Sequence, residues 1–204
     1  MKTPAIPGVM VRLKQSTAPM HDTLEALPAM RRLVDPALTR ADYHELLRRF
    51  YRANVACEHH LLRRASVWED LGYDWSSRLV KTAWLEDDLR HLDPAFAPTP
   101  FTPDPGFVPY AGEGLARAAG CLYVLEGSTL GSRMIVKLLD QAQQRPAAGA
   151  SRFFQGYGPA TGERWSRLGR ELEASLGGDE EALGGAVLAA GETYRFLGRI
   201  LADP

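Results

Sequence analysis

The chain has 204 residues, of which 45% are hydrophobic and 24% are charged, with 24 Lys and Arg against 25 Asp and Glu. This composition is typical of globular proteins, and the length allows one domain with one sizeable core. The near-zero net charge excludes a general electrostatic attraction to nucleic acid or to an anionic membrane. An anionic ligand must therefore be bound by a local cluster of cations.

Cysteine usage and hydropathy predict a cytoplasmic protein. Cys57 and Cys121 lie in apolar helical surroundings without metal-type spacing, which is typical of reduced core thiols. No apolar stretch reaches the roughly 18 charge-free residues that a membrane-spanning helix needs. Residues 1–8 hold two prolines and do not form a signal-peptide pattern.

Apolar side chains recur at helical spacing, and no segment shows the alternation of a strand. In chain order, we expect helices over residues 9–27, 39–64, 75–91, 113–141, 163–176 and 179–201. The second of these begins with Thr39 followed by Asp42, a pattern that predicts a capping box. Gly177 and Gly178 end the fifth, and Asp179 begins the last. These elements predict an all-α fold, a single-domain helical bundle over residues 1–204.

Residues 94–109 hold six prolines and cannot continue a helix, so they predict an irregular connection partly in polyproline conformation. Four apolar residues of this connection are expected to pack back onto the body: Phe96, Phe101, Phe107 and Val108. Residues 145–162 predict a second loop. Gly156 and Gly158 within it indicate turns and not a dinucleotide-binding loop, because no strand precedes them.

The most informative segment is LYVLEGSTLGSRM, residues 122–134. Gly127 and Gly131 lie four residues apart in it, on one face of the predicted helix. Each glycine inside a helix costs about 1 kcal/mol relative to alanine, so a pair on one face indicates that something approaches the backbone there. That neighbour is either a second helix, packed through small residues, or a flat ligand.

The first predicted helix carries a second informative residue, His21. Glu25 lies four residues later on the same face and can accept a hydrogen bond from one ring nitrogen, which leaves the other nitrogen to bind a metal. Lys14 lies seven residues earlier, about 10 Å along the helix axis, similar to the distance from a porphyrin iron to its carboxylate edge. A core or surface histidine is the alternative interpretation. Together with the glycine pair, His21 favours a socket for heme.

The segments LKQSTAPMHDTLE and LYVLEGSTLGSRM, in this order, resemble the heme oxygenase family. They are most similar to its bacterial, biliverdin-producing branch, which is associated with bacteriophytochromes. The resemblance covers nearly the whole chain, including the final helix, where Tyr194 falls at a position that lines the family's pocket. It implies a heme oxygenase-like fold and an enzyme that opens heme to biliverdin, CO and Fe²⁺ with O2 and a reductant. Heme is then both substrate and cofactor.

The resemblance implies which residues lie on the proximal side of the heme and which contact its propionates. It implies His21 as the ligand of the heme iron, Glu25 as the carboxylate that hydrogen-bonds to it, and Lys14 as a propionate contact. Arg170 matches a second basic residue that binds propionate. Where the family has another lysine, four residues before the histidine, this chain has Ala18. Propionate binding is therefore expected to depend on fewer cations, namely Lys14, Arg170 and Arg167.

The resemblance also assigns the catalytic, distal side to Gly127, Ser128 and Gly131. Animal-type enzymes have an aspartate at the position of Ser128, where it organises a water chain that delivers protons. A serine holds water but carries no charge, so this chain needs other groups for the proton route. Glu126 and Arg133 are the nearby candidates.

The implied reaction needs partners, because the chain shows no flavin or dinucleotide fingerprint. Electrons are expected from an external ferredoxin or flavoprotein reductase. The bacteriophytochrome-associated branch implies a bacteriophytochrome as a receiver of the biliverdin. No nucleic acid and no membrane is expected as a partner.

Two other functions fit parts of the sequence. A non-catalytic heme-binding or heme-transfer protein of the same fold is the main alternative, because Ser128 replaces the aspartate. A bundle that acts on thiamin-type pyrimidines would need a nucleophilic cysteine beside a glutamate, and Cys121 and Glu126 have poor helical geometry for that.

Two other motifs in the sequence are weak candidates for metal binding. The EHH at residues 58–60 places two adjacent histidines about 100° apart on a helix, which predicts a solvated or capping role. Asp88 and His91 form one D-x-x-H, whereas a di-iron bundle needs two E-x-x-H pairs.

Overall fold

The computed structural model describes residues 8–98, 101, 108–142 and 147–202. The longer helices are α1 (Val9–Glu25), α3 (Arg40–Leu62), α5 (Lys81–Leu92), α6 (Leu115–Gln141), α8 (Thr161–Leu176) and α9 (Glu180–Ala202). Shorter helical elements lie between them: α2 (Pro28–Leu33), α4 (Ser66–Glu69), η1 (Ser76–Arg78), α7 (Arg152–Gln155) and η2 (Gly158–Ala160). The described ranges contain no strand, so the predicted all-α bundle is confirmed.

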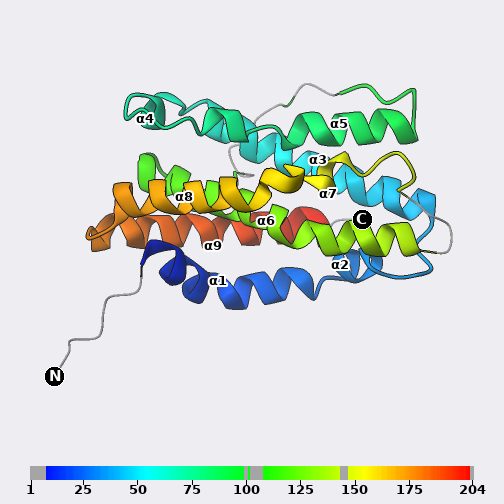
Figure 1. Cartoon of the computed structure of the whole chain (residues 1–204), viewed down its shortest axis with the longest axis horizontal. Coiled ribbons are helices and arrows are strands. Elements are labelled where there is room, and N and C mark those ends of the chain that lie inside the picture. Colours follow the sequence, from blue (N-terminus) through cyan, green and yellow to red (C-terminus); the bar gives the residue numbers. More distant parts are fainter. Residues whose placement is uncertain (1–7, 99–100, 102–107, 143–146, 203–204) are drawn as a thin grey trace.

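Helix α9 is the element on which the others pack, because it contacts α1, α3, α6 and α8 (Figure 1). Glycines allow this close packing. A Cβ added to Gly120 of α6 would overlap the carbonyl oxygen of Ala186 in α9, and one added to Gly191 of α9 would lie 2.9 Å from Sδ of Met20 in α1. Helices α1 and α6 therefore both rest on α9, and both also pack against α8.

Two groups of buried apolar side chains form the core. The first lies under α1, α6, α8 and α9 and includes Leu13, Leu122, Leu168 and Phe196. The second lies under α3, α5 and α7 and includes Leu47, Leu85 and Phe154. Burial of each such side chain contributes about 1.5–3 kcal/mol before the entropy cost of folding is subtracted.

Two predicted helix starts are confirmed by their capping hydrogen bonds. At the start of α3, the Asp42 N–H donates to Thr39 Oγ1 at 3.1 Å and the Thr39 N–H donates to the Asp42 carboxylate at 3.3 Å. Before α9, the Asp179 carboxylate accepts the N–H of Ala182 at 2.9 Å. Both signals are local in sequence, which is why they could be read directly.

The predicted start of the helix over residues 75–91 is wrong, because η1 comes first and α5 begins only at Lys81. Glu58 of α3 fixes that start by accepting the N–H groups of Lys81 at 2.7 Å and Thr82 at 3.2 Å. The predicted first helix likewise ends early, at Glu25, and Pro28 begins the separate helix α2. Pro is favoured at that first helical position.

The predicted loop over residues 145–162 contains the short helices α7 and η2. Asp88 of α5 holds α7 by accepting the N–H groups of Arg152 and Phe153, each at 2.8 Å. Gly156 and Gly158 have φ values of +55° and +56°, which confirms the predicted turns.

The expected solvated or capping role at residues 58–60 holds only for Glu58. His59 packs on Phe101, with ring centroids 4.9 Å apart, and His60 packs edge-on against Tyr110 at 4.5 Å. Burial lowers the pKa of His60 to about 4, so its ring is neutral at pH 7.

The contact of Phe101 with His59 confirms that this part of the proline-rich connection packs on the body of the protein, whereas Phe107 lies outside the described residues.

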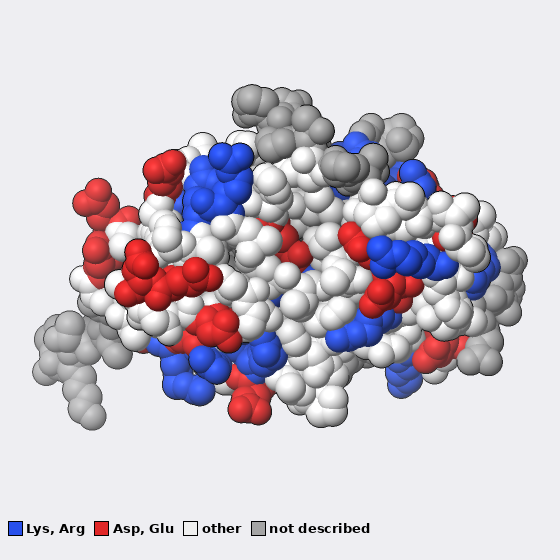
Figure 2. Space-filling view, turned by 90° about the horizontal axis from the view of Figure 1, so that it is seen from above, with Lys and Arg blue, Asp and Glu red and all other residues white. Residues whose placement is uncertain are grey.

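Basic and acidic side chains are interspersed on the surface formed by α4 and α5 (Figure 2). This mixture agrees with the formal net charge of −1. In the part of the chain that the structure describes, no helix combines the length and the apolarity needed to cross a membrane.

Gly120→Ala should lower the free energy of unfolding by about 1–3 kcal/mol, because the added methyl group forces α6 away from α9. Urea denaturation measures this change. Gly184→Ala is the matched control: a Cβ there meets no atom within 4 Å, so the gain in helix propensity should raise stability by about 0.5–1 kcal/mol. Equal effects of the two substitutions would contradict this account of the α6–α9 contact.

Candidate functional site

His21 lies on α1 with 48% of its side chain exposed. Its ring meets Tyr194 of α9 edge-on, with centroids 6.0 Å apart and an interplanar angle of 79°. Nε2 lies 3.5 Å from a Glu25 oxygen, and Nδ1 lies 3.6 Å from an Asp22 oxygen. Both distances are too long for strong hydrogen bonds, so either nitrogen is able to take a ligand.

One face of α6 is apolar and open. Gly127, Leu130, Gly131 and Met134 follow the i, i+3, i+4, i+7 spacing of a single helix face. Leu130 is 45% exposed and Met134 is 62% exposed. A Cβ added to Gly131 would meet no atom within 4 Å, whereas one added to Gly127 would lie 3.6 Å from the Trp165 ring. We call these four residues the open face of α6.

A chain of aromatic side chains connects His21 to the open face of α6. Tyr194, beside His21, lies close enough to Tyr123 for the two hydroxyls to interact electrostatically. Tyr123 in turn packs on Trp165, with centroids 5.6 Å apart, and Trp165 borders Gly127. Burial raises the pKa of the Tyr194 hydroxyl far above its ordinary value, because little water reaches this hydroxyl.

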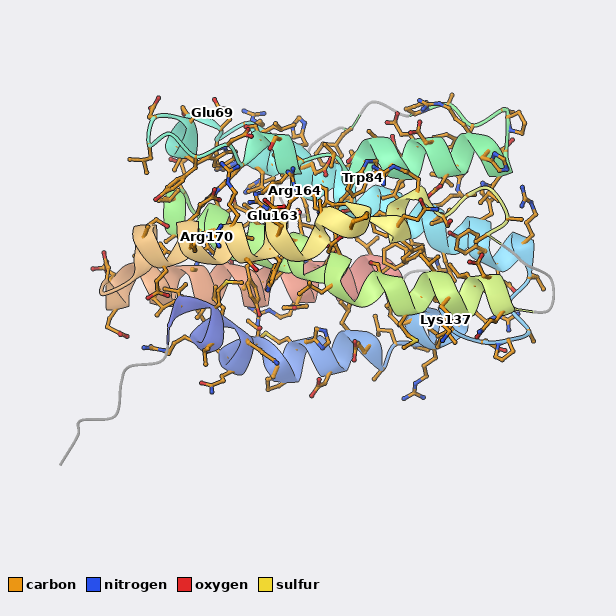
Figure 3. All side chains as sticks on the ribbon, in the orientation of Figure 1. Glu69, Trp84, Lys137, Glu163, Arg164 and Arg170 are labelled. Carbon is orange, nitrogen blue, oxygen red and sulfur yellow. The ribbon has the colours of Figure 1, made fainter. Side chains whose placement is uncertain are left out.

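Two cations lie on the helices that border the site. Lys14 of α1 and Arg170 of α8 are exposed, and no carboxylate among the described residues forms an ion pair with either. Helices α1 and α8 pack together, and Figure 3 shows Arg170 along α8. Arg167, one turn earlier, is already paired with Glu171 at 2.8 Å. Lys14 and Arg170 are therefore available as partners for an anionic ligand.

Hydroxyl groups around the glycine pair bond to their own helix. Ser128 donates to the Leu125 carbonyl at 2.7 Å, and Ser132 donates to the Ser128 carbonyl at 2.9 Å. Such bonds are typical of helices that bend. Because the Ser128 hydroxyl hydrogen is used, its oxygen is left to accept a hydrogen bond, for example from water.

Glu126 is buried among positive charges, which gives it a structural role instead of the suggested place in a proton route. Its carboxylate accepts hydrogen bonds from Arg78 at 3.0 Å, Lys81 at 2.6 Å and the Tyr157 hydroxyl at 2.9 Å. Burial by itself would raise the pKa of Glu126, but Lys81, Tyr157 and Arg78 outweigh it and hold the pKa below its usual 4.5. The other suggested proton donor, Arg133, has a side chain outside the described residues.

The structure thus brings His21, Glu25 and Tyr194 together. Gly127, Ser128 and Gly131 lie on α6, where Trp165 and Tyr123 link them to that group. Sequence reasoning missed Asp22 beside the His21 ring, and it missed Leu130 and Met134 on the open face of α6. The helical spacing of Leu130 and Met134 relative to the glycines could have identified them, but their exposure could not be read from sequence.

Comparison with known proteins decides between the interpretations of this arrangement. A family model described as heme oxygenase matches residues 8–203. The chain belongs to the heme oxygenase family. The predicted family is therefore confirmed, and with it an activity that opens heme.

Solved structures of heme oxygenases share the fold. The NO- and CO-bound heme oxygenase from Neisseria meningitidis superposes with a TM-score of 0.73 at 23% identity, covering 96% of this chain and 91% of that one. Heme oxygenase from Leptospira interrogans gives a TM-score of 0.72 at 16% identity, covering 97% of this chain and 100% of that one. A search of curated proteins finds no match. The predicted heme oxygenase-like fold is confirmed.

Glu126→Gln should lower the free energy of unfolding by about 3 kcal/mol or more at pH 7, because Arg78 and Lys81 are left as buried, uncompensated charges. The folded-state pKa of Glu126 lies below its ordinary value of 4.5. The stabilisation is therefore complete above pH 4.5 and is lost as the pH falls through the folded-state value. Denaturation at several pH values measures it.

Glu163→Gln, an exposed carboxylate on α8, is the control and should change stability by less than about 0.5 kcal/mol at every pH. If the difference in unfolding free energy between the wild type and Glu126→Gln stays constant down to pH 3, the assignment of a charged, buried Glu126 is refuted.

Proposed function

We propose that this protein binds heme between α1 and α6, with His21 as a ligand of the iron, and opens the ring to biliverdin, CO and Fe²⁺. One observation carries the proposal. An exposed imidazole on α1 and the open face of α6 are joined by Tyr194, Tyr123 and Trp165 in a chain of the heme oxygenase family.

The residues present suit heme as a ligand. A flat apolar ring would cover Leu130 and Met134, which are otherwise large apolar side chains left in water. Gly131 leaves room for the ring to touch the helix backbone. The two propionates of heme suit Lys14 and Arg170, two cations on the bordering helices for which no ion pair is seen among the described residues.

Each group has a defined task in this proposal. Bound heme supplies the iron on which O2 is activated. His21 would hold the iron through a ring nitrogen, and Glu25 would orient that ring by approaching the other nitrogen. Leu130 and Met134 exclude water and shield part of the ring edge. Ser128, whose oxygen is free to accept, holds a water on the catalytic side.

The same proposal includes an electron donor, a protein that receives the biliverdin, and a location in the cell. Electrons come from an external ferredoxin or flavoprotein reductase, since the sequence has no fingerprint for a flavin or a dinucleotide. The resemblance of both motifs to the bacteriophytochrome-associated branch supports a bacteriophytochrome as the receiver of biliverdin. A cytoplasmic location agrees with the two free cysteines, Cys57 and Cys121.

The function is tested by adding ferredoxin, ferredoxin reductase and NADPH to the heme complex in air. A biliverdin spectrum with release of CO is expected. An intact Soret band after many minutes, with the reductase shown to be active, would instead support the non-catalytic heme-transfer protein.

His21→Ala should abolish biliverdin formation and shift the Soret band of the heme complex, while the circular dichroism spectrum of the ligand-free protein stays unchanged. The reason is that the iron would lose its nitrogen ligand from the protein. Added imidazole should restore part of the wild-type spectrum. His91→Ala, an exposed histidine at the end of α5, is the control. A wild-type Soret band in His21→Ala would rule out the ligand assignment.

Gly131→Leu should weaken heme binding at least tenfold without unfolding the protein, since its side chain enters open space that heme is proposed to occupy. Tenfold corresponds to about 1.4 kcal/mol. Heme titration followed by absorbance gives the affinity, and thermal denaturation of the ligand-free protein checks the fold. Gly184→Leu on α9 serves as the control and should bind heme normally. Unchanged affinity in Gly131→Leu would exclude the open face of α6 as the heme surface.

A further inference from the structure

A cavity of about 400 Å³ lies where α7, η2 and α8 meet. Its walls include Arg152, Gln155, Tyr157 and Arg164, with Gly156 and Gly158 between them. It lies on the other side of α6 from the open face, because Gly156 adjoins Thr129 and the Tyr157 hydroxyl donates to Glu126. The proposed heme site does not use this cavity.

Two guanidinium groups in the cavity wall are held by aromatic rings. Arg152 stacks over Trp84 at 4.2 Å, and its Nη1 donates to the Gly156 carbonyl at 2.6 Å. Arg164 stacks over Tyr157 at 4.2 Å (Figure 3 shows Arg164 on α8 and Trp84 on α5). Trp84 and Tyr157 in turn meet edge-on at 5.1 Å. Stacking of this kind fixes the plane of each guanidinium group. Nη2 of Arg164 also donates to the Ser77 carbonyl at 3.2 Å, so the N–H groups that no such bond uses are left for a ligand.

Neither guanidinium group is neutralised within the described residues. No carboxylate there lies within ion-pair distance of Arg152 or Arg164, and the buried Nε of Arg164 has no hydrogen-bond partner. Two neighbouring carboxylates make other contacts, although Asp88 also attracts the Arg152 guanidinium group electrostatically. Asp88 accepts the N–H groups of Arg152 and Phe153, and Glu126 is compensated by Arg78 and Lys81. The cavity therefore carries an excess of positive charge.

We infer that this cavity binds a small organic or inorganic oxyanion with two or more negative charges. Guanidinium groups recognise carboxylate and phosphate oxygens through paired N–H donors, and two of them oriented by aromatic rings suit a ligand with two acidic groups. A volume of about 400 Å³ is within the range of small-molecule sites and exceeds the need of a single chloride or carboxylate. Carboxylate and phosphate ligands share this chemistry.

The protein without heme is titrated with citrate and, separately, with inorganic pyrophosphate at constant ionic strength, and the backbone amide signals of Gly156 and Gly158 are followed by NMR. A saturable shift with a Kd of about 1 mM or tighter is expected for at least one of them. The tighter of the two identifies the source as a polycarboxylate or a polyphosphate. Because no heme is present, a failure of the proposed heme site does not affect the result.

Arg152→Gln and Arg164→Gln should each weaken binding at least tenfold. Arg90→Gln, which removes an exposed arginine paired with Glu86 on α5, should leave binding unchanged. If either cavity variant does not fold, the corresponding Arg→Lys variant retains the charge without the paired donors and should bind at least threefold more weakly. The inference is overturned if neither anion gives a saturable shift up to 20 mM (roughly twenty times the expected Kd), or if Arg90→Gln weakens binding as much as the cavity variants.

Discussion

The close contact of α6 with α9 is the constraint on which the site depends. Gly120 has no room for a side chain beside the Ala186 carbonyl, so the two backbones pack directly against each other. Helix α1 rests on the same helix α9 through Met20 and Gly191. The distance between His21 and the open face of α6 is therefore set by small residues on a third helix, and neither side of the site can move without disturbing α9.

Charge and apolar surface are separated across α6. Glu126, with Arg78 and Lys81, is buried on one side of the helix, and Gly131 with Met134 is exposed on the other. A fixed ionic cluster resists rotation of the helix about its axis, because any rotation would bring unpaired charges into an apolar environment. The cluster thereby holds the glycines in the orientation that the proposed heme site needs.

Much of the fold could be predicted because its signals are local. The capping box at Thr39 and the stop at Gly177 involve residues within one or two turns of the helix end, and the structure follows them. The start of α5 could not be predicted, because Glu58, on a different helix, fixes it. Likewise the start of α7 depends on Asp88 of α5. When a side chain from another helix caps a segment, the sequence of that segment carries no pattern that predicts its start.

The site likewise contains residues that could be predicted from the sequence and residues that could not. The positions of His21 and the two glycines could be read from spacing and family resemblance, whereas Trp165 beside Gly127 is a contact made across helices.

The exposure of the Met134 side chain has a chemical consequence for the protein without ligand. An uncovered thioether is readily converted to its sulfoxide, which is polar and larger. While no ligand covers α6, this wall of the site is open to oxidative damage, so prolonged storage of the ligand-free protein in air erodes its apolar character.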